Sequence, residues 1–314
     1  MNPHQLSSGD LIADRRAEYA LMLAETGEHA AAADLMLQAL ELVPDWAAGW
    51  FRLADYQETS GEKAAAIEAL RKVVALQPDD MFGAGLKLSL LGDAEQPAQP
   101  PSLYVERLFD DYADRFDKAL VERLDYSVPQ KLAALIHVHG GADRFRHVVD
   151  LGCGTGLFGA EIRDRAASIE GFDLSTNMLA KAADKVIYSR LAQADLSLAP
   201  EACGVFSADA DADHRADLVS AADVLMYLGA LDGVFVIASR LLITSGLFAF
   251  SVEDAGEDGD VVLRPSLRYA HSEGYISRLC GSHGFDIHAV SRTVIRKDGG
   301  KPVSGILFVT RNTG

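Results

Sequence analysis

One segment, residues 147–156, constrains the fold of this chain more than any other. Its apolar first half is typical of a strand and ends in Asp150, and glycines at alternating positions then lead into a helical pattern. Glycine allows a turn that a Cβ atom would block and lets the backbone approach a ligand closely. The helix that follows points its free N–H groups at the same place. The segment therefore predicts a strand, a tight turn and a helix, with a binding site at the turn.

The alternation of strands and helices continues to the C-terminus. Helical stretches separate most of the apolar runs, which predicts an α/β fold with a Rossmann-like, doubly wound, mostly parallel sheet. The last two runs are joined by residues 296–302, which include Gly299 and Gly300, and they predict an antiparallel hairpin at one edge. The runs typical of strands are residues 147–151, 168–172, 218–221, 247–252, 286–295 and 305–310.

Acidic residues follow this glycine segment at positions where a sheet would bring them together. Asp150 ends the first run, Asp173 follows the second, and Asp195 lies further along the chain. An acid 17 residues past Gly156, at the tip of the next strand, has the geometry to bind ribose hydroxyls. Exposed amides on one side and a carboxylate on the other fit a zwitterionic amino acid, and the methionine end of S-adenosylmethionine is one.

On these residues the chain resembles the class I S-adenosylmethionine-dependent methyltransferases, over about residues 102–314. The resemblance implies an enzyme that moves a methyl group to an acceptor by in-line SN2 displacement, with S-adenosylhomocysteine as product. It also implies that Asp173 accepts hydrogen bonds from both ribose hydroxyls and that Asp195 faces the adenine amino group. The cofactor-binding residues that it implies are Asp150, Gly152, Cys153, Gly154, Gly156, Asp173, Leu174, Met178, Asp195, Leu196 and Ala222.

Two other interpretations stay open. Gly154, Gly156 and Gly159 formally match the dinucleotide-binding pattern G-x-G-x-x-G, and Asp173 follows at a suitable distance. However, Asp150 and Gly152 precede the match, whereas that pattern wants the apolar strand to run straight into its first glycine. The second alternative is a repeat-bearing scaffold or adaptor whose cofactor site is vestigial.

The N-terminal part repeats with a period of 34 residues, in the copies 13–46 and 47–80. Small residues recur at matching positions in each copy, and a glycine lies in the middle of each. The pattern resembles the tetratricopeptide repeat, a pair of antiparallel helices. A further helix at about residues 81–91 is expected to cap the stack. Such repeats imply a protein partner or a homodimer.

The proline-rich residues 96–101 predict a linker, so we expect a helical-repeat domain at 1–96 and a methyltransferase domain at 102–314. The combination resembles a group of bacterial methyltransferases that contain tetratricopeptide repeats. An amphipathic helix is expected at 103–119, and Tyr112 and Phe116 share one of its faces. We assign both to the cofactor site as parts of a lid; the alternative is that they are core aromatics.

The acceptor pocket is expected in residues 253–272. A general base is needed only if the nucleophile carries a proton, and His271 is the candidate. The alternative is a histidine beside a helix N-terminus. Arg264 and Arg268 either bind a substrate carboxylate or phosphate or are solvated charges. The sequence does not define the methyl acceptor, which is a small molecule or a protein.

Charge and composition disfavour several classes of partner and indicate the location of the protein. The net charge is −17, from 29 Lys and Arg against 46 Asp and Glu, which disfavours nucleic acids and anionic membrane surfaces. Three cysteines cannot make a disulfide framework, and the polar first ten residues do not read as a secretory signal, so a cytoplasmic location is expected. No spacing of His, Cys or acidic residues predicts a metal site.

Overall fold

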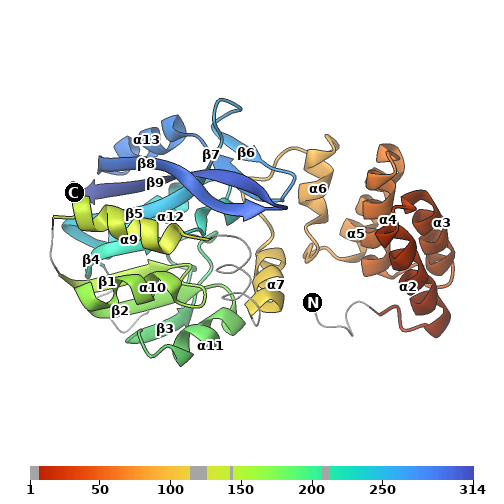
Figure 1. The fold of residues 1–314 in the computed structure, drawn as a ribbon, viewed down its shortest axis with the longest axis horizontal. Coiled ribbons are helices and arrows are strands. Elements are labelled where there is room, and N and C mark those ends of the chain that lie inside the picture. The colour runs from red at the N-terminus through yellow and green to blue at the C-terminus, as the bar shows by residue number, and fades with distance from the viewer. Residues whose placement is uncertain (1–6, 114–125, 142–143, 207–212) are drawn as a thin grey trace. The chain divides into compact units, whose positions relative to one another are not determined.

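The computed structural model describes residues 7–113, 126–141, 144–206 and 213–314 (Figure 1). The chain forms two compact units, Met1–Asp111 and Tyr112–Gly314. This boundary falls at the end of a helix, whereas the domains that we predict divide at the linker before that helix, and their limits stay a prediction. Among the described residues, no helix combines the length and hydropathy of a membrane span.

The first unit is built from paired helices. Helix α2 packs against α3 and α4 against α5, and Gly27 and Gly61 follow the first helix of each pair. Alanines such as Ala13, Ala17 and Ala32 are buried where the helices meet, because a small side chain lets two helices approach closely. The described helices of the unit are α2 (Leu11–Glu25), α3 (His29–Leu40), α4 (Ala47–Thr59), α5 (Lys63–Leu76), α6 (Ala84–Leu90) and α7 (Ser102–Tyr112).

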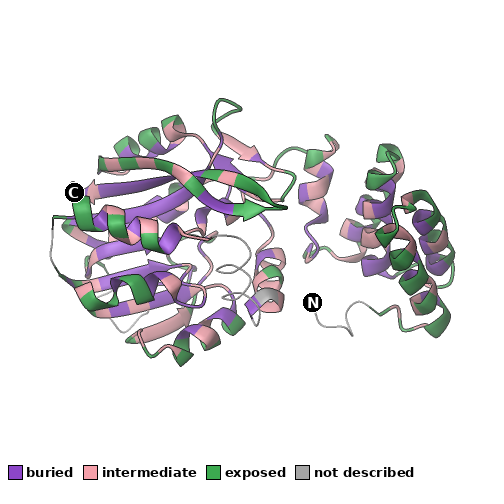
Figure 2. Cartoon of the chain, in the orientation of Figure 1, coloured by how far each residue is buried: buried purple, intermediate pink, exposed green. Residues whose placement is uncertain are grey.

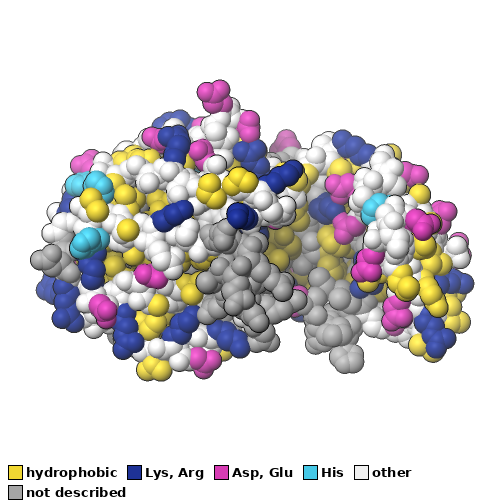
Figure 3. All heavy atoms as spheres, viewed as in Figure 1, with side chains coloured by type: hydrophobic (Ala, Val, Ile, Leu, Met, Phe, Trp, Pro, Cys, Tyr) yellow, Lys and Arg dark blue, Asp and Glu magenta, His cyan; other side chains and the backbone are white. Residues whose placement is uncertain are grey.

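Helix α6 packs against α5, at the place where we expected a capping helix. The outer surface of α2 and α3 carries large apolar side chains, and Figure 3 shows hydrophobic groups on the surface of this unit. Helix α7 covers the first part of the lid helix that we expected. The Tyr112 side chain and all of Phe116 lie outside the described residues, so their role stays a prediction. The exposed apolar residues of α2 and α3 are Leu11, Ile12, Tyr19, Leu21, Met22 and Leu37, and Leu42 lies just after α3.

The second unit contains the expected sheet. Parallel strands run in the order β3-β2-β1-β4-β5, and antiparallel β9 and β8 continue from β5. This confirms the Rossmann-like fold and its edge hairpin. The strands are β1 (Phe145–Leu151), β2 (Ala166–Asp173), β3 (Arg190–Gln193), β4 (Ala216–Ala221), β5 (Leu242–Asp254), β6 (Val261–Leu263), β7 (Tyr269–His271), β8 (Phe285–Asp298) and β9 (Lys301–Asn312).

Alternate residues of the strands belong to two hydrophobic clusters, so the sheet is covered on both faces (Figure 2). Val149 and Leu151 pack in the cluster that includes α12 and α13, whereas Val148 packs in the cluster that includes α9 and α10. Figure 1 shows the two groups of helices on opposite sides of the sheet. The helices of this unit are α9 (Val128–His139), α10 (Leu157–Ile162), α11 (Thr176–Asp184), α12 (Asp232–Leu241) and α13 (Glu273–Ser282).

The edge hairpin turns more tightly than we expected. Only Gly299 and Gly300 lie between β8 and β9, with φ of 53° and 79°. Two positive φ angles match the right-handed twist of a hairpin, and glycine adopts them without strain. The ladder therefore continues through most of residues 296–302. As a result Arg296 lies in a strand rather than in a loop.

Strand β5 extends past the end of β4. Glu253 pairs with Gly305 of β9 and also with Ala270 of β7, so these neighbours lie on opposite sides of β5. Beyond Ala221 the edge of β5 next to β4 is therefore taken over by the small β6–β7 hairpin. Strands β3, β6 and β7 are not among the runs that we predicted, because each has only three or four residues.

Candidate active site

The glycine loop connects β1 to α10. Gly152, Gly154 and Gly156 have φ of 65°, 54° and 89°, the left-handed region that glycine adopts freely. The Cys153 N–H donates to the Phe172 carbonyl at 2.9 Å, which fixes the start of the loop to β2. The loop thus brings its backbone to the carboxyl ends of β1 and β2, as the sequence predicts.

Asp173 holds the loop from the tip of β2. Its Oδ2 accepts the Gly154 N–H at 2.8 Å, and its Oδ1 accepts the Ser175 N–H at 2.9 Å. Ser175 caps α11, and its hydroxyl accepts the Met178 N–H at 3.1 Å. Leu174, which lies between Asp173 and Ser175 in the sequence, is half-buried. Met178 is fully buried. One carboxylate therefore joins the loop to the start of α11.

Asp150 is buried and bonded within the protein. The Ser220 hydroxyl donates to its Oδ1 at 2.7 Å, and the Tyr188 hydroxyl donates to its Oδ2 at 2.8 Å. Burial raises the pKa of Asp150 to about 6, against these two hydrogen bonds, and the charge of Asp173 adds to the rise. We expected this carboxylate to face the ligand, but both of its oxygens bind neighbouring strands and loops. A contact with the cofactor stays a prediction.

Tyr188 explains three glycines that surround it. A Cβ atom at Gly156 or Gly171 would lie 2.9 Å from a ring carbon of Tyr188, and one at Gly159 would overlap its hydroxyl. The third glycine of the dinucleotide-like pattern thus makes room for a tyrosine. Sequence reasoning missed Tyr188. The signal that was available is the glycine at 171, inside a strand, where a close neighbour is the usual reason.

The raised pKa of Asp150 predicts a pH effect that its asparagine variant lacks. Folding favours the protonated carboxyl, because burial raises its pKa to about 6 in the folded chain, from an ordinary value of 3.8. Between about pH 4 and pH 7 the wild-type protein should therefore lose roughly 3 kcal/mol of stability relative to Asp150→Asn. Urea unfolding followed by circular dichroism measures this difference. An equal difference at both pH values contradicts the prediction.

The other predicted cofactor residues occupy the ends of β1, β3 and β4. Cys153 is buried, and burial raises the pKa of its thiol well above the usual range. Asp195 follows β3, and its Oδ1 accepts the Ser197 N–H at 2.9 Å. Leu196 is buried in the core, and Ala222 is half-buried directly after β4. All of them stand along the carboxyl edge of the sheet.

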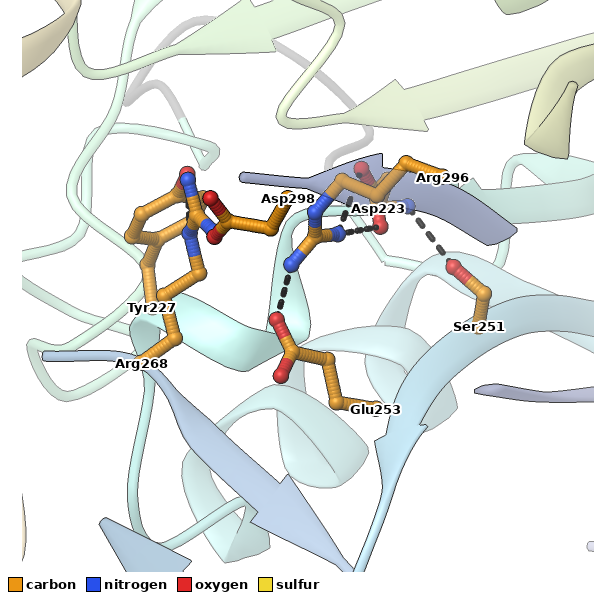
Figure 4. A network of polar contacts seen from close by, with 7 residues as sticks. All are labelled: Asp223, Tyr227, Ser251, Glu253, Arg268, Arg296 and Asp298. Carbon is orange, nitrogen blue, oxygen red and sulfur yellow. Dashed lines mark hydrogen bonds and ion pairs between the residues drawn. The ribbon is translucent and has the colours of Figure 1, made fainter. Parts of the chain in front are cut away.

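A network of charged side chains lies at the end of β4 and β5 (Figure 4). Asp223 directly follows Ala222 and has a left-handed φ of 58°. The Arg296 guanidinium donates to both Asp223 oxygens, at 2.9 and 3.2 Å, and also binds Glu253. Burial raises the pKa of both carboxyls, whereas Arg296 and Arg268 lower it. Arg296 is only 3% exposed and was missed, because the sequence placed it in a connector.

Arg268 extends this network. Its Nε donates to the Tyr227 hydroxyl at 3.1 Å, and another nitrogen donates to Asp298 at 3.0 Å. Arg264 binds Asp258 at 2.7 Å. Both arginines thus have acidic partners within the protein.

His271, the candidate general base, lies in the core. Its side chain is 0% exposed, and its Nε2 lies 2.9 Å from the Gly229 carbonyl. Burial lowers the pKa of His271 to about 4, so the ring is neutral at pH 7. In this position His271 holds β7 against the segment after η3 (Leu225–Tyr227), and its role as a general base stays a prediction.

A cavity of about 290 Å³ opens at the carboxyl end of β5. It is surrounded by the end of β5, the β6–β7 turn and the start of β9. Its wall mixes carboxylates, an arginine and serines with two prolines and a valine. The lining residues are Glu253, Asp254, Arg264, Pro265, Ser266, Pro302, Val303 and Ser304.

The strand order reverses between β1 and β4, and the glycine loop lies beside this switch point. Together with a carboxylate at the end of β2, this defines an α/β domain of the class that binds a nucleoside-containing cofactor. The chain belongs to the methyltransferase family, since the family model described as a methyltransferase domain matches residues 120–290. A tetratricopeptide-repeat model matches residues 47–80, the second of the two copies that we expected.

Solved structures share this fold. A 1,6-didemethyltoxoflavin-N1-methyltransferase from Burkholderia thailandensis, with bound 1,6-didemethyltoxoflavin and S-adenosylhomocysteine, matches with a TM-score of 0.52 and 19% identity, over 70% of this chain and 94% of that one. The [4+2]-cyclase SpnF matches with a TM-score of 0.53 and 15% identity, over 69% and 98%. Such identities show the fold alone, so the family model carries the assignment. No curated protein matches.

Proposed function

We propose that this protein binds S-adenosylmethionine at the loop between β1 and α10 and transfers its methyl group to an acceptor at the carboxyl ends of β4 and β5. The observation that carries the proposal is the position of Asp173, which accepts the N–H groups of Gly154 and Ser175. This contact gathers a carboxylate, a glycine loop and the start of α11 at one place, where a nucleoside with an amino-acid tail finds both donors and acceptors.

The residues at this place fit the cofactor. A carboxylate has about four acceptor positions, so Asp173 has the capacity to bind ribose hydroxyls while it holds the loop. Asp150 and Asp173 interact electrostatically, and a nearby cation would relieve their repulsion. When bound there, S-adenosylmethionine supplies a methyl group that is already activated by a positively charged sulfur. The protein's own task is to align the acceptor and to exclude water.

The cavity at the end of β5 supports an acceptor of small size that presents polar and apolar groups. Its volume of about 290 Å³ is close to the lower limit for pockets that bind small molecules. Glu253 links it to the network that holds the turn after β4. Crystallographic fragment screening of the protein with S-adenosylhomocysteine tests this placement. Polar fragments in the cavity support it, and fragments bound only elsewhere contradict it.

The donor site is tested by calorimetry on the full chain. We expect S-adenosylhomocysteine to bind with a micromolar Kd and NAD to give no heat at millimolar concentration. Binding of NAD instead would identify a nicotinamide enzyme. No heat with either S-adenosylmethionine or its product would favour the scaffold with a vestigial site.

The helical unit is proposed to contact a second protein chain. The support is its set of exposed apolar side chains on α2 and α3, because contiguous apolar surface marks interaction sites. Light scattering on the full chain separates the possibilities. A dimeric mass identifies a second copy of this chain as the partner, and a monomeric mass leaves a different protein.

A further inference from the structure

The turn after β4 is held in an unusual conformation. Asp223 has a φ of 58°, and non-glycine residues seldom adopt the left-handed region unless their surroundings impose it. Two contacts impose it here. The Asp223 N–H donates to the Ser251 hydroxyl at 2.8 Å, and the Asp223 carboxylate binds Arg296 (Figure 4). The conformation of the turn thus depends on groups from β5 and β8.

The residue after Asp223 contacts the cofactor loop. A Cβ atom at Gly152 would overlap the side chain of Val224, so Val224 packs directly on the Gly152 backbone. Gly152 is the first of the three left-handed glycines. The position of Val224 therefore sets how the turn after β4 and the loop after β1 meet, and this junction lies between the proposed donor and acceptor sides.

Arg296 has the chemistry to fix this junction from a distance. Its guanidinium binds two carboxylates at once, on half-buried Asp223 and on buried Glu253, and a planar fork of donors makes such a contact where a lysine ammonium does not. It is anchored in β8, next to the bulge between Val294 and Arg296.

We propose that Arg296 is a positioning residue for methyl transfer, which acts through Asp223 and Val224 to hold the turn after β4 against the cofactor loop. The inference rests on the proposed function. It predicts that weakening the Arg296 contact lowers the affinity of the folded protein for S-adenosylhomocysteine, although Arg296 lies in a different strand from every predicted cofactor residue.

The experiment compares four variants of the full chain by calorimetry with S-adenosylhomocysteine and by urea unfolding. Arg296→Met removes the contact, Arg296→Lys keeps the charge without the fork, and Val224→Ala shortens the side chain that packs on Gly152. Arg292→Met is the matched control, because Arg292 lies in the same strand, also binds acids, and is 61% exposed. We expect about a tenfold rise in Kd for the first three and less than about a twofold change for the control.

A merely structural role would lower the urea midpoint and leave the Kd of the folded protein unchanged. Wild-type Kd values in folded Arg296→Lys and Val224→Ala therefore overturn the inference. If neither Arg296 variant folds, Val224→Ala decides, since it tests the contact with Gly152 and leaves the ion pairs in place. Failure of the wild-type protein to bind S-adenosylhomocysteine is a separate result, and it contradicts the proposed function itself.

Discussion

Replacement of Asp173 by alanine is expected to weaken the binding of S-adenosylhomocysteine by at least about 100-fold. The carboxylate accepts two backbone N–H groups, from Gly154 and Ser175, and the proposed ribose contacts would be lost with it. A hydrogen bond to a charged group contributes about 1.5–3 kcal/mol, so loss of the two proposed ribose contacts accounts for an effect of this size. Calorimetry with the full chain measures it.

Two further variants show whether the effect belongs to this carboxylate. Asp173→Asn should also bind S-adenosylhomocysteine less tightly, because the NH2 group of the asparagine would face one of the two N–H donors. Asp184→Ala should bind normally, since Asp184 lies exposed at the end of α11. Binding by Asp173→Ala within about threefold of the wild type would mean that the cofactor does not lie at this loop.

Replacement of Tyr188 by alanine is expected to lower the free energy of unfolding of the second unit by about 3–5 kcal/mol. The ring fills the space left by Gly156, Gly159 and Gly171, so its removal leaves a cavity among them. It also leaves buried Asp150 without one of its two hydroxyl donors. Tyr188→Phe removes only the hydroxyl and should cost about 1–3 kcal/mol.

The measurement has to report on the second unit. Both tryptophans, Trp46 and Trp50, lie in the first unit, so tryptophan fluorescence reports the unfolding of that unit instead. Hydrogen exchange of peptides from β1 and β2 gives the local stability directly. Val138→Ala is the control, because Val138 is 71% exposed on α9, and its effect should stay within about 0.7 kcal/mol. Unchanged exchange in Tyr188→Ala would contradict the packing role.

The sequence predicts those features that depend on local patterns. The glycine loop, the long strands and the hairpin follow from residue spacing, because apolar periodicity and glycine conformation act over a few residues. The 34-residue period likewise predicts the paired helices. Strand β3 was not predicted, because it has only four residues, none of them fully buried, and no apolar run of its own; it is defined by its pairing with β2.

The site is harder to predict, because its side chains meet across the sheet. Asp173 was found, since an acid at a strand tip next to a glycine loop has a local signature. Arg296 was not, because it reaches Asp223 from 73 residues further along the chain. The burial of His271 likewise depends on a tertiary contact, with the Gly229 carbonyl, which the sequence does not reveal.

Because β5 extends past β4, the two halves of this single strand have different neighbours. Its first half pairs with parallel β4 on one side and antiparallel β9 on the other, whereas its last residues have the β6–β7 hairpin in place of β4. If the acceptor binds at this end of β5, as proposed, a β6–β7 hairpin of another length is expected to change the acceptor and to leave cofactor binding unchanged. Such an arrangement lets evolution change the methyl acceptor and leave the cofactor site unaltered.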